Sequence, residues 1–480
     1  MLRRLRRVGV APFCVIALSG LAACAGKTPP AGGGTAPQGN GAVVEPPRFT
    51  PSGAATVKPE SRSVYAGTRA AIFDATWTTL RDKHYDPTLG GVDWQAVRAR
   101  YEARAMGAPD EPTFYRVMND MLGELKQSHL FLTGPGDESE FGVNPDEGVD
   151  GGGVSASSVG SLGDPGLTIR VIGPGAGAPT ITAVRPNSSA ARAGLRTGTI
   201  VSHVGGRPLA TLKSRRAMRP VEERFYLRRA AMQALSGPVG SQVTLRIVEG
   251  ATTKDVLLRR DAHAESAMRI GNLGPLYPEV SSRQVGDVGV VAFNYFLLEP
   301  VLKKVADAIE QFRVRKVKGI VIDLRGNPGG VAAMAIPLVR QLVNKRTPLG
   351  TLAHRDHQNS LVAEPSLDVT PYLGPVVILT DEGTASTSEI FAAGLQEAGR
   401  AHVVGQVTLG QALPSVIESL PGGAVLQYVV ADFKTPKGVA LEGRGVIPDR
   451  QVLETPAALA QGMDPVLEAA LTIVRSKGKL

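Results

Sequence analysis

The sequence predicts an α/β fold built on a largely parallel sheet, and two observations carry this prediction. From about residue 285 onward, apolar runs such as GIVIDLR and PVVILT alternate with helical segments such as PVLKKVADAIEQF and SEIFAAGLQEAGR. The runs are apolar along nearly their whole length, which is typical of strands buried on both faces. Alternating strands and helices are the pattern of parallel βα units. We therefore expect an α/β core over residues 263–457 and a short helical tail over residues 458–480.

A helical subdomain is predicted before the core, over residues 63–135. Asp93 is placed as the N-cap of its second helix. The last stripe runs out at KQSHL, so His129 falls in the turn after the third helix. Three apolar stripes recur at the spacing of one helical face: Phe73, Trp77 and Leu80; Trp94, Val97 and Tyr101; and Phe114, Val117, Met118, Met121, Leu122 and Leu125.

Residues 178–262 change to short β runs, namely APTITAV, GTIVSHV, QVTLRIV and KDVLLRR. Among them, RPNSSAARAGLRTGTIVSHVGGRPL resembles a PDZ domain, with Gly198-Thr199 and Gly205-Gly206 at its turns. Such a module offers a sheet edge to an extended peptide tail. The Gly- and Ser-rich residues 136–177 show no strand followed by a helix, and we expect a loop or linker there.

The amino terminus predicts export. It reads MLRRLRRVGVAPFCVIALSGLAAC, with four arginines before an apolar run that is too short to span a membrane. Leu21-Ala22-Ala23-Cys24 looks like a bacterial lipobox, in which residues 1–23 are a signal peptide and Cys24 is lipidated. Residues 24–62 are rich in Gly, Pro and Ala, which predicts a flexible tether. We expect a protein anchored by lipid to a bacterial membrane, on its periplasmic face or at the cell surface.

Composition excludes several function classes. The two cysteines, Cys14 and Cys24, fall in the signal and the lipobox, so the mature chain has no thiol left for a disulfide, a metal or catalysis. Removal of residues 1–23 takes away four arginines and no acidic residue, which lowers the net charge from +9 to +5. No basic run is interleaved with aromatic residues, so we expect no nucleic-acid partner. No metal or nucleotide cofactor is implied.

The segment DEGTASTSEI, residues 381–390, follows the apolar run GPVVILT. Two interpretations of Ser386 in this segment are possible. Ser386 and Glu389 have the spacing of a capping box at a helix start. Ser386 is also placed as a nucleophile where a strand gives way to a helix, and it then needs a base from elsewhere in the chain. His is the usual general base, but the residues alone do not choose among His84, His129, His203, His263, His354, His357 and His402.

Three motifs resemble one peptidase family. GIVIDLRGNPGG, ILTDEGTASTSEIFAAGLQEAGRAHVVGQVTLG and LEGRGVIPD are similar, in order, to the catalytic domain of the C-terminal processing (tail-specific) and tricorn-core serine peptidases. The resemblance covers roughly residues 64–455 and implies a crotonase/ClpP-like ββα core with an inserted PDZ-like domain. It implies Ser386 as nucleophile, with Ser388 as a rival. It also implies an oxyanion hole from the N–H of Thr387 and that of Gly329 or Gly330.

The chain departs from one branch of this family. Enzymes of the Ser-Lys type carry a Lys base in T-F-G-K-G, where this sequence has TLGQA with Gln411. The tricorn-like branch instead uses a Ser-His pair and a Glu. Ser128-His129 and Glu442 match those places, so the resemblance implies that His129 is the base, Ser128 its partner and Glu442 the group that polarises Ser128.

We therefore expect a membrane-tethered, extracytoplasmic serine endopeptidase that cleaves peptides or protein C-terminal regions through an acyl-enzyme. An inactive pseudopeptidase that binds peptides as a scaffold is the alternative. A Ser-Lys enzyme that uses Lys434 or Lys437 is a third possibility.

Overall fold

A computed structural model describes residues 59–135, 162–212, 218–263, 268, 276–297 and 301–477. The predicted signal segment, Cys24 and nearly all of the predicted tether lie outside these residues, so the structure does not bear on them. Within the described ranges, no helix is long and apolar enough to cross a membrane.

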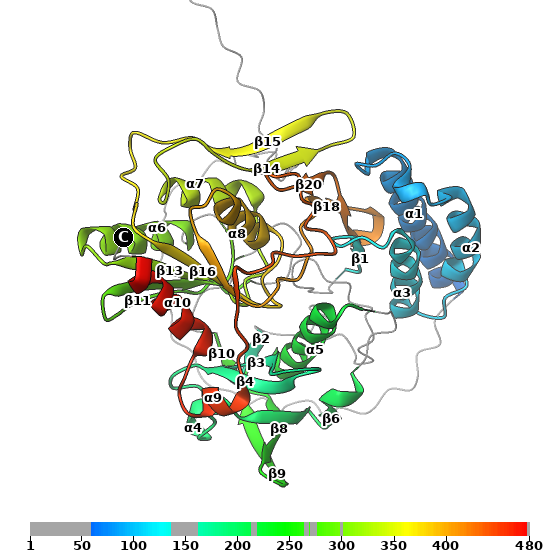
Figure 1. Cartoon of the computed structure of the whole chain (residues 1–480). Coiled ribbons are helices and arrows are strands. Elements are labelled where there is room, and N and C mark those ends of the chain that lie inside the picture. The colour runs from blue at the N-terminus through cyan, green and yellow to red at the C-terminus, as the bar shows by residue number, and fades with distance from the viewer. Residues whose placement is uncertain are drawn as a thin grey trace, which may run out of the picture.

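Three N-terminal helices stand at one side of the molecule (Figure 1). They are α1 (Pro59–Lys83), α2 (Trp94–Met106) and α3 (Glu111–Leu122), and every member of the three predicted stripes is buried. The Asp93 carboxylate accepts the Ala96 N–H at 2.9 Å, which confirms the predicted N-cap. Because α1 begins at Pro59, the assignment of residues 59–62 to the tether is wrong.

The central sheet has six strands in the order β11-β12-β13-β16-β17-β21. Neighbouring strands from β12 to β21 are parallel, whereas β11 is antiparallel to β12, so the predicted parallel core is confirmed. The strands are β11 (Val280–Val285), β12 (Val288–Phe293), β13 (Gly319–Asp323), β16 (Val376–Thr380), β17 (His402–Gly405) and β21 (Arg450–Gln451).

Helices cover both faces of this sheet. α6 (Val301–Val314), α7 (Ala335–Arg340) and α8 (Thr387–Glu397) share a buried apolar cluster with one face. The opposite face packs against α10 (Pro465–Lys477), which follows the short α9 (Pro456–Ala460). The predicted C-terminal tail is therefore helical as expected, but it is a layer of the core rather than an appendage.

After the Gly-rich turn that follows β13, the chain forms a 3₁₀ turn (Ala332–Met334) that leads directly into α7.

The β-rich region forms a six-stranded antiparallel sheet around its own buried cluster, in the order β3-β4-β5-β8-β9 with β6 paired to β5. The linker predicted over residues 136–177 is wrong for residues 162–172, which form β2 and the edge strand β3. The helix α5, which packs against β3, was not predicted from the sequence. The elements are β2 (Leu162–Asp164), β3 (Leu167–Ile172), β4 (Ala178–Val184), α4 (Ser189–Arg192), β5 (Ile200–Val204), β6 (Arg207–Pro208), α5 (Pro220–Leu235), β7 (Gly237–Pro238), β8 (Gln242–Glu249), β9 (Thr252–Arg259) and β10 (Asp261–Ala262).

Short strands join the N-terminal helices to the core. β1 (Phe131–Thr133) pairs antiparallel with β19 (Val425–Val429), and β19 pairs with β18 (Ser415–Ser419). Because β1 begins two residues after His129, this pairing brings the QSHL turn against the C-terminal part of the core. A further sheet has the order β15-β14-β20, with β14 (Thr347–Ala353), β15 (Gln358–Ala363) and β20 (Asp432–Lys434).

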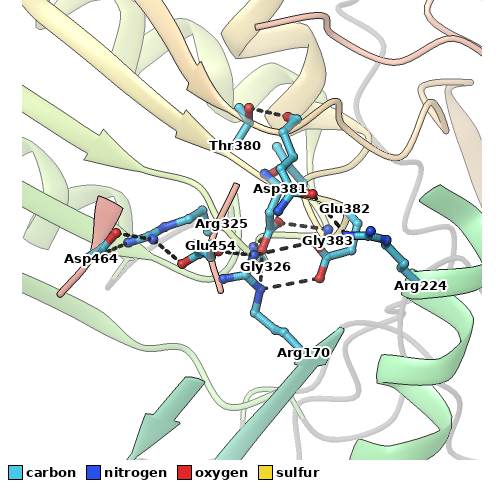
Figure 2. Close-up of polar contacts among 12 residues, drawn as sticks. Arg170, Arg224, Arg325, Gly326, Thr380, Asp381, Glu382, Gly383, Glu454 and Asp464 are labelled. Atoms are coloured by element: carbon cyan, nitrogen blue, oxygen red, sulfur yellow. Dashed lines mark hydrogen bonds and ion pairs between the residues drawn. The ribbon is translucent and has the colours of Figure 1, made fainter. Parts of the chain in front are cut away.

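A buried ion network ties the β-rich region to the core (Figure 2). The Arg170 guanidinium on β3 lies 2.8 Å from both the Asp381 and the Glu454 carboxylates, and 3.4 Å from that of Glu382. Arg325 lies at 2.9 Å from Glu454 and 2.8 Å from Asp464.

The electrostatics of this network depend on all its members. Burial by itself disfavours the charged Arg170, but attraction to the three carboxylates outweighs it and raises the Arg170 pKa. Burial raises the pKa of Glu382, whereas Arg170 and Arg228 overcome the effect of burial at Asp381 and hold its pKa low. A buried pair of this kind is stable only while both partners are present. The network thus fixes residues 381–382, the start of the turn that leads to Ser386.

Candidate active site

Ser386 lies where β16 gives way to α8, as the sequence predicts. It is the N-cap of α8, with φ 54° and ψ −121°, a strained conformation for a residue with a side chain. Ser386 is partly exposed, while residues 381–385 and 387–390 on either side of it are buried. The Glu389 carboxylate accepts the Ser386 N–H at 3.0 Å, which is the contact expected of the capping box. The rival Ser388 is buried, and its hydroxyl lacks a hydrogen-bond partner among the described residues.

The Gly-rich turn after β13 lies against Ser386. A Cβ on Gly329 would come within 2.8 Å of the Ser386 Cβ and of the Thr387 nitrogen, so only glycine allows this approach. The Gly329 N–H donates to the Asn327 side-chain oxygen at 2.9 Å and is not free for a ligand. In the described part of the chain, the N–H groups of Gly330 and Thr387 have no acceptor. Of the two glycines named from the sequence, Gly330 therefore suits an oxyanion hole better.

Asn327 is a site residue that the sequence analysis missed. Its amide donates to the Phe293 carbonyl at 2.9 Å, its side-chain oxygen accepts from Gly329, and its carbonyl accepts the Ala385 N–H at 3.1 Å. It therefore links β12, the Gly-rich turn and the Ser386 turn. The only signal for Asn327 in the sequence is its position in the segment GNPGG, where the glycines were the residues considered for the oxyanion hole.

Ser128, His129 and Glu442 are joined by hydrogen bonds. The Ser128 hydroxyl lies 2.8 Å from His129 Nδ1 and 3.0 Å from Glu442 Oε2. The Ser128 N–H also donates to Glu442 Oε1 at 3.0 Å. His129 itself has φ 55°, so the base candidate and the nucleophile candidate both occupy the left-handed region that side chains disfavour.

These contacts determine the His129 tautomer. An ionised Glu442 can only accept, so the single Ser128 hydroxyl proton points to Glu442 and Ser128 must accept from His129 Nδ1–H. In the neutral ring Nε2 then carries a free lone pair, as a general base requires. Burial lowers the pKa of His129 to about 4, so the ring is neutral at neutral pH. Burial raises the pKa of Glu442, and three hydrogen-bond donors oppose that rise.

The two halves of the site meet at one loop. The Ser386 N–H donates to the Gln411 carbonyl at 2.9 Å, and the Ala412 N–H donates to Glu442 Oε2 at 3.1 Å. No hydrogen bond joins His129 to Ser386 among the described residues. Catalytic hydrogen bonds of this kind are often long before substrate binds. Position 411 thus contributes backbone groups where the Ser-Lys enzymes have their base.

The other candidate bases and ligands do not join this site. Lys434 and Lys437 are exposed, whereas a lysine base must be buried to lose its proton near neutral pH. His354 and His357 stack on each other with ring centroids 4.3 Å apart. In the described ranges, no group of three or more His, Cys, Asp or Glu side chains is placed to hold a metal ion.

Comparison with known proteins agrees with this architecture. Residues 287–452 match the model of peptidase family S41, and residues 66–123 match the tricorn protease C1 domain. The carboxyl-terminal-processing protease of Synechocystis sp. is 27% identical over 408 residues, which cover 83% of this chain and 85% of the relative. A probable CtpA-like serine protease of Staphylococcus saprophyticus is 27% identical over 275 residues, 57% of this chain and 50% of that protein.

A solved structure shares the fold. The photosystem II D1 C-terminal processing protease matches with a TM-score of 0.53 and 22% identity, over 86% of this chain and 97% of that one. Residues 287–452 of the chain therefore carry a peptidase family S41 domain, and carboxyl-terminal-processing proteases are among its relatives.

Proposed function

We propose that this S41 peptidase cleaves peptide bonds near the C-termini of proteins through an acyl-enzyme, with Ser386 as nucleophile and His129 as general base. One observation carries the assignment: the hydrogen-bonded series Glu442–Ser128–His129 reaches the Ser386 turn through residues 411–412. The preference for C-terminal regions rests on the names of the relatives alone.

In this mechanism Ser386 Oγ attacks the carbonyl carbon of the scissile bond while its proton passes to His129 Nε2. The oxyanion that forms accepts hydrogen bonds from the N–H groups of Gly330 and Thr387. Collapse of the tetrahedral intermediate breaks the C–N bond, and His129 returns the proton to the leaving amine. A water molecule then attacks the acyl carbon, again with His129 as base, which releases the new carboxylate and restores Ser386.

Ser128 and Glu442 act on His129 from behind. When the ring gains a proton at Nε2, its Nδ1–H still donates to Ser128, and the Glu442 carboxylate offsets the positive charge through that hydroxyl. Protonation of Glu442 would reverse the direction of both hydrogen bonds and place the ring proton on Nε2. The proposed base therefore requires an ionised Glu442.

The first test is labelling by a fluorophosphonate probe, which forms a covalent bond with activated serines. Ser386→Ala should abolish labelling, and His129→Ala should slow it by roughly 10²- to 10⁴-fold, the contribution usual for a general base. Ser388→Ala is the matched control and should label like the wild type. Labelling that survives Ser386→Ala would place the nucleophile elsewhere, and wild-type labelling of His129→Ala would remove the proposed base.

A second test concerns the carboxylate behind the base. Glu442→Gln should slow labelling by roughly 10²- to 10⁴-fold, because the amide keeps one acceptor oxygen for three donors and can turn an N–H toward Ser128. Ser128 would then donate to Nδ1 and the lone pair on Nε2 would be lost. Glu418→Gln, on β18 and paired with Lys83, should have no effect. Equal rates for Glu442→Gln and the wild type would contradict the tautomer assignment.

We also propose that residues 162–262 form a PDZ-like module that recruits substrate tails. The β3 edge of its sheet lies beside α5, which is a suitable place for an extended peptide to add a strand. Full-length Ser386→Ala protein should bind peptides with a free C-terminal carboxylate more tightly than their amidated forms, as measured by fluorescence anisotropy. Equal affinity for both forms would argue against tail recruitment.

The membrane anchor is a separate proposal that rests on the lipobox motif. Wild-type protein expressed in a bacterial host should incorporate radiolabelled palmitate and sediment with membranes, whereas Cys24→Ala should do neither, because it lacks the thiol that carries the lipid. Sedimentation that is unchanged in Cys24→Ala would show that the chain is held by something other than this lipid.

A further inference from the structure

Glu389 is a fully buried carboxylate one turn into α8, and four donors converge on it. Thr408 Oγ1 and the Gly410 N–H reach Oε1 at 2.5 and 2.7 Å. The N–H groups of Gln411 and Ser386 both reach Oε2 at 3.0 Å. The side chain is fully shielded from solvent, so these donors take the place of its hydration shell.

Three consecutive backbone N–H groups of the loop 408–412 therefore end on two carboxylates. Those of Gly410 and Gln411 donate to Glu389, and that of Ala412 donates to Glu442. Glu389 also holds the Ser386 N–H, while Glu442 holds Ser128 and, through it, His129. The loop is thus a backbone bridge between the proposed nucleophile and the proposed base, with one carboxylate at each end.

The rest of the loop is fixed from other elements. Leu409 N–H donates to the Thr384 carbonyl at 3.0 Å, within the Ser386 turn. At the N-cap of α5, the Arg219 guanidinium donates to the Leu409 carbonyl at 2.6 Å and to the Gly443 carbonyl at 2.5 Å. Arg219 pairs with Glu222 rather than with Glu389. No described cation contacts Glu389, so its charge is held by hydrogen bonds and by its place near the N-terminus of α8.

We propose that Glu389 is a positioning residue of the catalytic site, whose ionised carboxylate fixes the loop 408–412 and so sets Ser386 in register with His129. This inference rests on the proposed function of Ser386 and His129. It assigns to Glu389 a role beyond capping α8, since a cap needs only the Ser386 N–H and the loop supplies three further donors.

Protonation should release this arrangement. All four partners donate, so only the ionised carboxylate can accept from each of them. Burial raises the pKa of Glu389 to about 7. Because the pKa in the folded state exceeds that of an unfolded Glu, the contribution of Glu389 to the stability of the fold increases as pH falls below about 7. The population of the proposed active form, in which Glu389 is ionised, increases in the opposite direction, as pH rises through about 7.

The test measures the rate of labelling by a fluorophosphonate–rhodamine probe between pH 6 and 8. The wild-type rate should rise about tenfold over this range, as the ionised fraction of a group with this pKa does. Glu389→Gln should label about 10²-fold more slowly at pH 8, the cost of a small misplacement of reacting groups, and should lack the rise. The matched control is Glu397→Gln, at the other end of α8, where the carboxylate accepts from Thr435 and from the Lys437 N–H and should not affect the rate.

Thermal melts of each variant show whether Glu389→Gln folds. If it does not, Thr408→Val, which removes one donor from the carboxylate, should shift the rise to higher pH, and an unshifted rise would overturn the inference. A Glu389→Gln protein that folds and keeps the wild-type rate and pH profile would also overturn it. Both of these outcomes leave the proposed function intact as long as Ser386→Ala does not label, whereas labelling of Ser386→Ala would refute the proposed function itself.

Discussion

The site depends on one constraint: a backbone loop with three successive N–H groups must find acceptors where its surroundings are largely buried. Residues 410–412 find them on Glu389 and Glu442, which come from a helix start and from a turn far along the chain. Each carboxylate also accepts a hydrogen bond from a serine of the site: Glu389 from the Ser386 N–H, and Glu442 from the Ser128 hydroxyl. The proposed nucleophile and the proposed base lie about 250 residues apart in sequence, and this shared need for hydrogen bonds gives them a common frame.

Buried charged groups also fix the other side of the Ser386 turn. Residues 381–382 are fixed by Arg170, which reaches them from β3, and Arg325 continues the network to Glu454 and Asp464 (Figure 2). Buried charges of this kind stabilise a fold little compared with apolar packing, but loss of one partner is costly. They therefore specify one arrangement of the turn. Ser386, with its disfavoured φ of 54°, is strained in a way that only such over-determined surroundings can maintain.

Local signals in the sequence were enough for most of the fold. Apolar patterning predicted the strands β13 and β16 and the helices α6 and α8. The capping box predicted the contact between the Glu389 carboxylate and the Ser386 N–H, because it joins residues only three positions apart. Non-local partners were beyond reach: nothing in TLGQA indicates that its N–H groups meet two carboxylates. β3 was missed because it lies at the end of a Gly-rich stretch. His129 and Glu442 came from resemblance rather than from pattern, since each alone is an ordinary polar residue in a turn.

The loop also gives a physical reason why this chain can lack the lysine of the Ser-Lys peptidases whose motifs it resembles. A lysine serves as a base only if its surroundings lower its pKa toward neutrality, which apolar burial does and a nearby carboxylate reverses. Here Glu442 accepts from Ala412, directly after position 411, so an ammonium group placed close to it would hold its proton. For the imidazole of His129 the same carboxylate is favourable. It does not contact the ring, but it orients the ring through the Ser128 hydroxyl. Once Glu442 occupies this place, a histidine base and a neutral side chain at position 411 are the mutually consistent choice.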